Sequence, residues 1–203
     1  LRKKQMGFDG RSVSISGSGN VAQYAADKAT ELGAKVITLS DSGGTLVHEA
    51  GISHGMLQDL MEFKNVQRGR LKDFCKQHKL KFEADKRPWH VPVDIALPCA
   101  TQNELDGADA KHLIANGVLC VAEGANMPST LEAVDHFLAA GVLYAPGKAS
   151  NAGGVATSGL EMSQNAMRLA WSHSEVDLRL HEIMKDIHGN CVRHGERKDG
   201  TVN

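Results

Sequence analysis

A glycine-rich turn between a short strand and a helix constrains the fold of this chain more than any other feature. Residues 11–16 (RSVSIS) alternate apolar and polar side chains, which is typical of a strand. The turn at 17–22 (GSGNVA) follows, and apolar or small residues then recur at helical spacing over 20–32. Residues 35–39 (KVITL) form a second predicted strand. Together these segments predict one βαβ unit.

The turn matches the G-x-G-x-x-G/A pattern of dinucleotide-binding domains, with Ala22 in the third small position. The first glycine allows a sharp turn, the second lets the backbone approach a pyrophosphate, and the exposed amides of the helix N-terminus favour phosphate. An ordinary tight turn is the alternative, but the flanking strand and helix favour the binding loop. The residues predicted to bind the pyrophosphate are Gly17, Ser18, Gly19, Asn20 and Val21.

The residues after the second strand leave the choice of dinucleotide open. Asp41 alone would accept a hydrogen bond from a ribose 2′-hydroxyl and repel a 2′-phosphate, which favours NAD. A 2′-phosphate would need hydroxyl and basic partners instead. The candidates for that role are Ser42, Lys64, Arg68 and Arg70. From spacing alone, a solvated basic face explains the three basic residues equally well.

The rest of the chain continues to alternate short strands with helices. Strands are predicted at 80–83, 93–97, 118–122 and 142–145, and helical spacing occurs at 53–66, 71–78, 103–116 and 128–140. Pro128 is expected near a first helical position. Residues 42–47 indicate a turn and a small excursion. This order predicts an α/β fold, a modified Rossmann domain with a mostly parallel sheet and helices on both faces.

The pattern changes after residue 150, where two long helices are predicted at 151–171 and 175–193 with no strand between or after them. Residues 195–203 are polar and are expected to fray. We therefore interpret 1–203 as one dinucleotide-binding domain that ends in a helical segment at 150–194.

Composition excludes several classes of protein. A net charge of −1 with 4% aromatic residues argues against a nucleic-acid binder. No run approaches the roughly 18 apolar residues of a membrane span, and no signal-type segment opens the chain, which indicates a cytoplasmic protein without membrane contact. The cysteines form no Cys-x-x-Cys pair and the histidines no His-Glu-x-x-His motif, so we expect reduced thiols and no metal.

Longer motifs identify a family. The runs SGSGNVAQYA (16–25), VDIALPCATQNEL (93–105), VAEGANMP (121–128) and APGKASNAGGVATSGLEMSQNA (145–166) closely resemble the coenzyme domain of hexameric, NADP-linked glutamate dehydrogenases. The resemblance covers nearly the whole chain, and its later motifs are more specific than the glycine loop. It implies an oxidoreductase that reversibly deaminates L-glutamate to 2-oxoglutarate and ammonia, and that assembles as a homohexamer.

The resemblance also assigns roles to individual residues. It places the 2′-phosphate of NADP on Ser42, Lys64 and Arg70, and so resolves the coenzyme toward NADP. It places the ribose and nicotinamide beside Ala100, Thr101, Gln102 and Asn126, and the junction of nicotinamide and substrate at Asn151. Val155 and Ser158 would face the substrate side chain, with the serine hydroxyl at its distal carboxylate. On the residues alone, Asn126 and Asn151 could equally be helix caps.

The catalytic groups implied by the resemblance lie outside this sequence. In the family a lysine of lowered pKa and a proton-shuttling carboxylate belong to a preceding substrate domain, which we expect to be absent here. Lys148 could be considered in place of the family's catalytic lysine. We instead predict a surface or structural role for it, because no proton partner is identifiable nearby. We therefore expect the chain alone to bind coenzyme without turnover and to contain no catalytic residue.

Two other functions remain open at this point. A related dehydrogenase acting on leucine, valine or phenylalanine would share the fold, although Ser158 argues against it because an apolar side chain needs no hydroxyl. A non-catalytic dinucleotide sensor would share the glycine loop and act through a partner.

Overall fold

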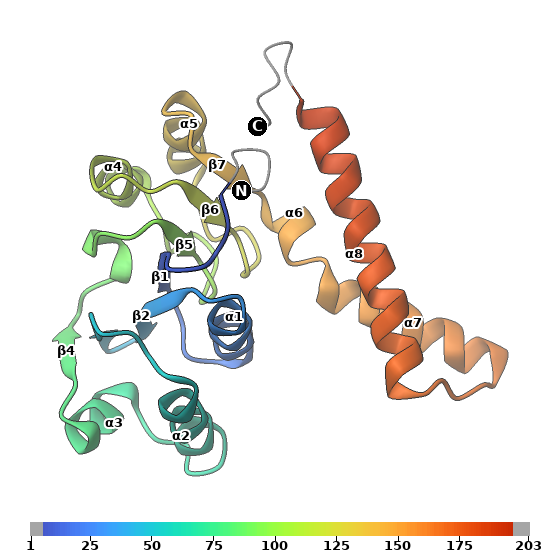
Figure 1. Cartoon of the computed structure of the whole chain (residues 1–203), viewed down its shortest axis with the longest axis horizontal. Coiled ribbons are helices and arrows are strands. Elements are labelled where there is room, and N and C mark those ends of the chain that lie inside the picture. Colours follow the sequence, from blue (N-terminus) through green and yellow to red (C-terminus); the bar gives the residue numbers. More distant parts are fainter. Residues whose placement is uncertain (1–5, 197–203) are drawn as a thin grey trace.

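A seven-stranded sheet forms the centre of the molecule, in the order β4-β3-β2-β1-β5-β6-β7 (Figure 1). The computed structural model describes residues 6–196. The strands are β1 (Ser12–Ile15), β2 (Lys35–Asp41), β3 (Gly44–Val47), β4 (Lys81–Ala84), β5 (Ile95–Leu97), β6 (Cys120–Ala122) and β7 (Leu143–Ala145). The neighbours from β2 through β1, β5 and β6 to β7 pair in parallel, which confirms the predicted α/β fold.

Strand β3 is the main departure from the sequence prediction. Residues 42–47 were expected to form only a turn and an excursion, but β3 pairs antiparallel with both β2 and β4. The reversal depends on Gly44, which has a φ of +143°. A Cβ at this position would lie 2.2 Å from the carbonyl oxygen of Glu83, so only glycine lets the strands approach this closely.

Helices cover both faces of the sheet and enclose two cores. They are α1 (Asn20–Glu31), α2 (His54–Asn65), α3 (Leu71–His78), α4 (Gly107–Ala115) and α5 (Leu131–Ala139), with a 3₁₀ turn, η2 (Pro88–His90). The core beneath α1, α2 and α3 includes Ile95, and the core beneath α4 and α5 includes the next residue, Ala96. Successive residues of β5 therefore point to opposite faces, as in any strand covered on both sides.

Two helices begin later than predicted. Helix α4 begins at Gly107 and not near residue 103, because the side chain of Asp106 accepts hydrogen bonds from the amides of Ala108 and Asp109. Helix α5 begins at Leu131, capped by the Thr130 hydroxyl. The expectation that Pro128 lies near a first helical position is wrong, since the segment before Thr130 is extended and bridges to residue 105.

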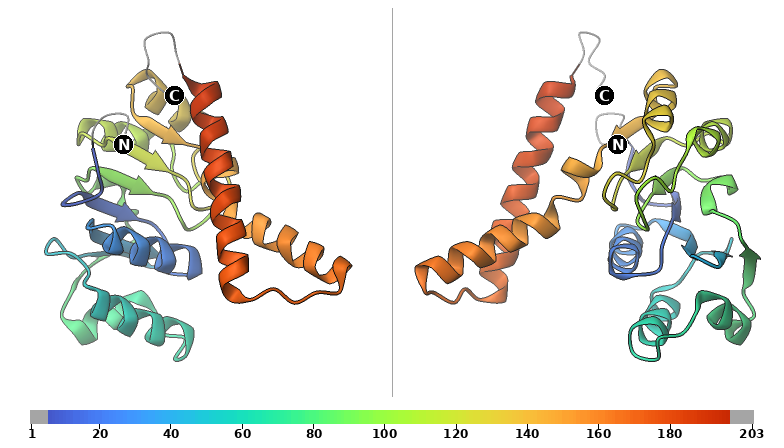
Figure 2. Two further views of the ribbon diagram at one scale, coloured as in Figure 1. Left: turned by 45° about the vertical axis from the view of Figure 1, so that its right-hand side comes forward. Right: turned by 180° about the vertical axis from the view of Figure 1, so that it is seen from behind.

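The C-terminal helices form an arm that extends away from the sheet (Figures 1 and 2). The helix predicted at 151–171 corresponds to α7 (Gly153–Met167), and a short helix that was not predicted, α6 (Gly147–Ser150), precedes it. A long helix, α8 (His173–Gly195), then runs back alongside α7. Neither α7 nor α8 contains a buried residue. The prediction that 195–203 frays falls almost entirely outside the described residues.

Within residues 6–196, no helix combines the length and the apolar character needed to cross a lipid bilayer.

Candidate coenzyme site

The candidate site lies where the connections of the sheet diverge. From β1 the chain continues to β2 on one side, and it later returns to β5 on the other side of β1. The loops that follow β1 and β5 therefore separate at the carboxyl edge of the sheet. In doubly wound α/β folds this divergence creates the crevice in which ligands bind.

Gly17 is required by the packing of the protein itself. Its φ is +84°, and a Cβ there would lie 3.0 Å from the carbonyl oxygen of Cys99 and 3.2 Å from the Cα atom of Ala100. Its amide donates a 2.9 Å hydrogen bond to the hydroxyl of Ser40, whose own amide donates to the Gly17 carbonyl at 3.0 Å. The sharp turn after β1 is thus fixed from both neighbouring strands.

Gly19 differs, because the packing of the chain gives no reason for a glycine there. It has an ordinary φ of −88° at the N-cap of α1, and a Cβ would meet nothing within 4 Å. Having no side chain, it cannot cap the helix, so the first amides of α1 receive no side-chain cap from this residue. Asn20 and Val21 are exposed beside it. This is the geometry expected where a phosphate approaches a helix N-terminus.

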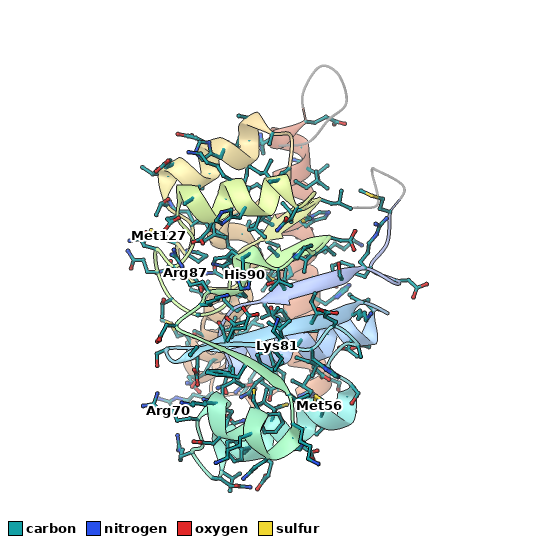
Figure 3. The ribbon with its side chains drawn as sticks, turned by 90° about the vertical axis from the view of Figure 1, so that its left-hand side faces the viewer. Met56, Arg70, Lys81, Arg87, His90 and Met127 are labelled. Carbon is teal, nitrogen blue, oxygen red and sulfur yellow. The ribbon has the colours of Figure 1, made fainter. Side chains whose placement is uncertain are left out.

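The residues predicted for a 2′-phosphate come together at the end of β2. Arg70, the N-cap residue of α3, donates through Nη1 to the hydroxyl of Ser42 at 3.3 Å. Lys64, in the last turn of α2, places Nζ 3.8 Å from Oδ2 of Asp41. Arg68 lies in the exposed turn between these helices. Arg70 and Met127, which follows Asn126, project on the same side of the molecule (Figure 3).

Asp41 is turned toward the protein. Its Oδ1 accepts from the amide of Gly43 at 2.9 Å, and its Oδ2 accepts from the amide of Leu71, the first residue of α3, at 3.0 Å. These contacts compete with the predicted hydrogen bond to a ribose hydroxyl. The carboxylate instead joins the turn after β2 to the helix that carries Arg70.

The loop after β5 rests on Glu104, which sequence reasoning did not identify as a functional residue. Its Oε1 accepts from the hydroxyl of Ser16 at 2.8 Å and from the amide of Ala100 at 2.9 Å. Burial raises the pKa of Glu104, and these hydrogen bonds oppose the rise. The predicted coenzyme residues Ala100, Thr101 and Gln102 remain exposed above this carboxylate.

The loop after β6 packs against both preceding loops. The amides of Gly124 and Ala125 donate to the carbonyl of Pro98 at 2.8 and 2.9 Å. A Cβ on Gly124 would lie 2.6 Å from Sγ of Cys99 and 3.1 Å from a methyl carbon of Val21. Asn126 follows as an exposed residue, and it does not cap α5, since Thr130 does.

Asn151 lies at the junction between the sheet and the arm. It ends α6, and its Nδ2 donates a 3.0 Å hydrogen bond to the carbonyl of Ala125. The N-cap of α7 is Ala152, so Asn151 is not the cap of the helix it precedes. Val155 and Ser158 are exposed on the first turns of α7, and Lys148 is exposed on α6.

Fold and site together define an α/β domain of the doubly wound class, modified by the antiparallel strand β3. Over residues 1–202 the sequence matches the family described as Glutamate/Leucine/Phenylalanine/Valine dehydrogenase. The chain belongs to this family.

Relatives and solved structures agree with this assignment. A protein of Escherichia coli (strain K12) named NADP-specific glutamate dehydrogenase is 60% identical over 99% of the chain and 45% of its own length. One from Xylanibacter ruminicola, named NAD(P)-specific glutamate dehydrogenase, is 53% identical over all of the chain and 46% of its own length. The crystal structure of Plasmodium falciparum glutamate dehydrogenase superimposes with a TM-score of 0.90 at 42% identity, over 96% of the chain and 42% of that protein. The chain thus spans about half the length of its relatives.

Proposed function

We propose that this chain is the coenzyme-binding part of an NADP-dependent glutamate dehydrogenase. The observation that carries the proposal is the convergence of Ser42, Lys64 and Arg70 at the end of β2. Two cations and a hydroxyl at this point suit a phosphate better than a ribose hydroxyl. The Escherichia coli relative is named NADP-specific, which supports NADP as the coenzyme. The Xylanibacter ruminicola relative is named NAD(P)-specific, so the preference between NADP and NAD must be measured.

In this proposal the coenzyme lies across the crevice between the loops after β1 and β5. The residues that bind its pyrophosphate are Gly17, Ser18, Gly19, Asn20 and Val21. Ala100, Thr101, Gln102 and Asn126 contact the ribose and nicotinamide. When bound, the coenzyme supplies hydride chemistry, and the chain's own residues hold it in place and exclude water.

The proposed substrate site lies at the base of the arm. Asn151 contacts both the nicotinamide and the substrate, and Val155 and Ser158 face the substrate side chain. These last two residues are three positions apart on α7 and therefore share one face of the helix. We further propose that the reactive lysine and carboxylate lie outside the span of this chain. In the same proposal the intact enzyme is a cytoplasmic homohexamer.

Calorimetry and activity assays together test the proposal. We expect the chain to bind NADP more tightly than NAD and to form no NADPH from glutamate. We expect the full-length protein to form NADPH with glutamate, and much more slowly with leucine, valine or phenylalanine. Preference for an apolar amino acid would favour the related dehydrogenases of the family, and glutamate-dependent NADPH formation by the chain alone would overturn the placement of the catalytic groups.

A further inference from the structure

Glu123 is a buried carboxylate directly beneath the proposed nicotinamide end of the site. It follows β6, and only 3% of its surface is exposed. Its Oε2 accepts from the amide of Gly147, the first residue of α6, at 2.7 Å, and its Oε1 accepts from the amide of Ser129 at 3.2 Å. One side chain therefore joins the two ends of the Asn126 loop to the start of the arm.

Further contacts reinforce this junction. The hydroxyl of Ser150 donates to the backbone carbonyl of Glu123 at 2.5 Å. Burial, and next the interaction with the Glu123 carboxylate, raises the pKa of Tyr144. A Cβ on Gly147 would lie 3.0 Å from the carbonyl oxygen of Ala125 and 3.2 Å from Oε2 of Glu123, so the two segments are in close contact.

The arm depends on this junction for its placement. Helices α7 and α8 bury no residue of their own, and the arm joins the sheet through α6, which also contacts α8 (Figures 1 and 2). Removing a carboxylate from water is costly unless its oxygens are paired. Glu123 has donors on both oxygens, and these donors come from segments that carry proposed site residues.

We propose that Glu123 is a positioning residue that fixes Asn126 and Asn151 relative to each other, and thereby orients the nicotinamide half of the coenzyme toward the substrate. The inference rests on the proposed function. Glu123 itself touches no ligand, since its carboxylate is buried beneath the loop. We expect its effect to be confined to the nicotinamide half. The residues proposed for the 2′-phosphate lie near the end of β2, and β1 and β5 separate β2 from β6 in the sheet.

The substitution Glu123→Gln tests the role with little change of volume. It replaces one acceptor oxygen by an NH₂ group that must face a backbone amide, and two donors cannot bond. The measurement compares the Kd of NADP with that of 2′,5′-ADP, a probe that carries the 2′-phosphate but lacks the nicotinamide. We expect the Kd of NADP to rise about tenfold, because the free energy of one hydrogen bond to a charged group corresponds to a factor of about this size. We expect 2′,5′-ADP binding to change less than about twofold.

Asp94→Asn is the matched control. Asp94 also joins neighbouring strands, accepting from the Ser12 amide at 2.9 Å and from Arg11 Nη1 at 3.0 Å, but it lies at the opposite, amino edge of the sheet. We expect it to leave both Kd values within about twofold of wild type. Tyr144→Phe is the second test variant, because it removes one partner of Glu123 and keeps the ring; it should weaken NADP binding selectively, by less than Glu123→Gln.

The fluorescence of bound NADPH reports the nicotinamide environment directly. We expect Glu123→Gln to shift this emission toward that of free NADPH, while Asp94→Asn leaves it unchanged. Equal losses for both probes, or no change for NADP in both Glu123→Gln and Tyr144→Phe, would contradict the positioning role. Failure of the wild-type chain to bind 2′,5′-ADP would instead contradict the proposed function.

Discussion

The Nζ atom of Lys64 lies 3.8 Å from Oδ2 of Asp41, and only 18% and 13% of these side chains are exposed. The same carboxylate oxygen accepts from the first amide of α3. An acidic residue at the end of β2 would ordinarily repel a 2′-phosphate. Here Lys64 offsets the charge of Asp41 locally, and Arg70 supplies positive charge beside Ser42.

Lys64→Ala should therefore weaken NADP binding more than the loss of one contact would. The substitution removes a cation from the proposed phosphate pocket and leaves the Asp41 carboxylate with its two backbone amide donors but without a neighbouring cation. We expect the Kd of NADP to rise about 10- to 100-fold, while the Kd of NAD changes little. Isothermal titration calorimetry with both coenzymes measures the difference.

Lys72→Ala provides the control, since Lys72 is an exposed lysine on α3 next to the same region. It should leave both affinities within about twofold of wild type, as expected for a solvated surface charge. Equal losses of NADP and NAD affinity in Lys64→Ala would show that Lys64 does not recognise the 2′-phosphate.

The two glycines of the binding loop should respond differently to alanine. Gly17→Ala forces a left-handed conformation on a residue with a Cβ and creates a contact with the Cys99 carbonyl, so we expect a loss of at least about 1–2 kcal/mol in the free energy of unfolding. Gly19→Ala has open space and should cost less than about 1 kcal/mol. It should nevertheless reduce NADP affinity, because its methyl group would occupy the position of the pyrophosphate.

Urea unfolding and calorimetry on both variants separate these effects. Gly19→Ala with unchanged coenzyme affinity would argue that the pyrophosphate does not lie on this loop.

The sequence patterns were sufficient for the elements around the glycine loop because local and long-range preferences agree there. The strand at β1, the helix at α1 and the strand at β2 lie where periodicity places them. Strand β3 could not be found in this way, since Gly44–Val47 is short and follows a turn. Its extended form depends on pairing with β2 and β4, which lies beyond local sequence.

Some residues of the candidate site could be predicted from the sequence and others could not, for a physical reason. Ser42, Lys64 and Arg70 have side chains that can bind phosphate, and the family resemblance assigned them this role where spacing alone left a solvated basic face equally possible. The structure brings them together at the end of β2. Glu104 and Glu123 bind backbone amides from below, a role that neither residue type nor spacing signals. For Glu123 the available signal was an acidic residue directly after the short strand β6, where a solvated side chain is not expected. Glu104 lies further along the loop after β5 and carried no such signal.

Acid should weaken the edge of the sheet through Glu83. A hydrogen bond from Lys81 lowers the pKa of Glu83 from the usual 4.5 to about 2, and His90 contributes a second bond. Because the folded pKa is lower than the unfolded one, the stabilisation is fully present above about pH 5 and is lost as the pH falls toward 2. The stability difference between wild type and Glu83→Gln should therefore shrink between pH 5 and pH 3, as followed by urea unfolding. A difference that grows on acidification would contradict this sign.

Thiol reagents should distinguish the cysteines. Burial raises the pKa of both Cys75 and Cys99 to about 12, so their thiols stay protonated at neutral pH. Cys191 is exposed on α8. We expect Cys191 to react rapidly in the native chain, and Cys75 and Cys99 to react only on unfolding, as mass spectrometry of labelled peptides would show. Rapid native labelling of Cys99 would contradict its burial beneath the loops after β5 and β6.

A crystal structure of the chain with NADP tests the central claim most directly. The account predicts the pyrophosphate against the amides of Gly19, Asn20 and Val21, and the 2′-phosphate within hydrogen-bond distance of Ser42, Lys64 and Arg70. Coenzyme bound elsewhere, or a 2′-phosphate turned away from those three side chains into solvent, would contradict it.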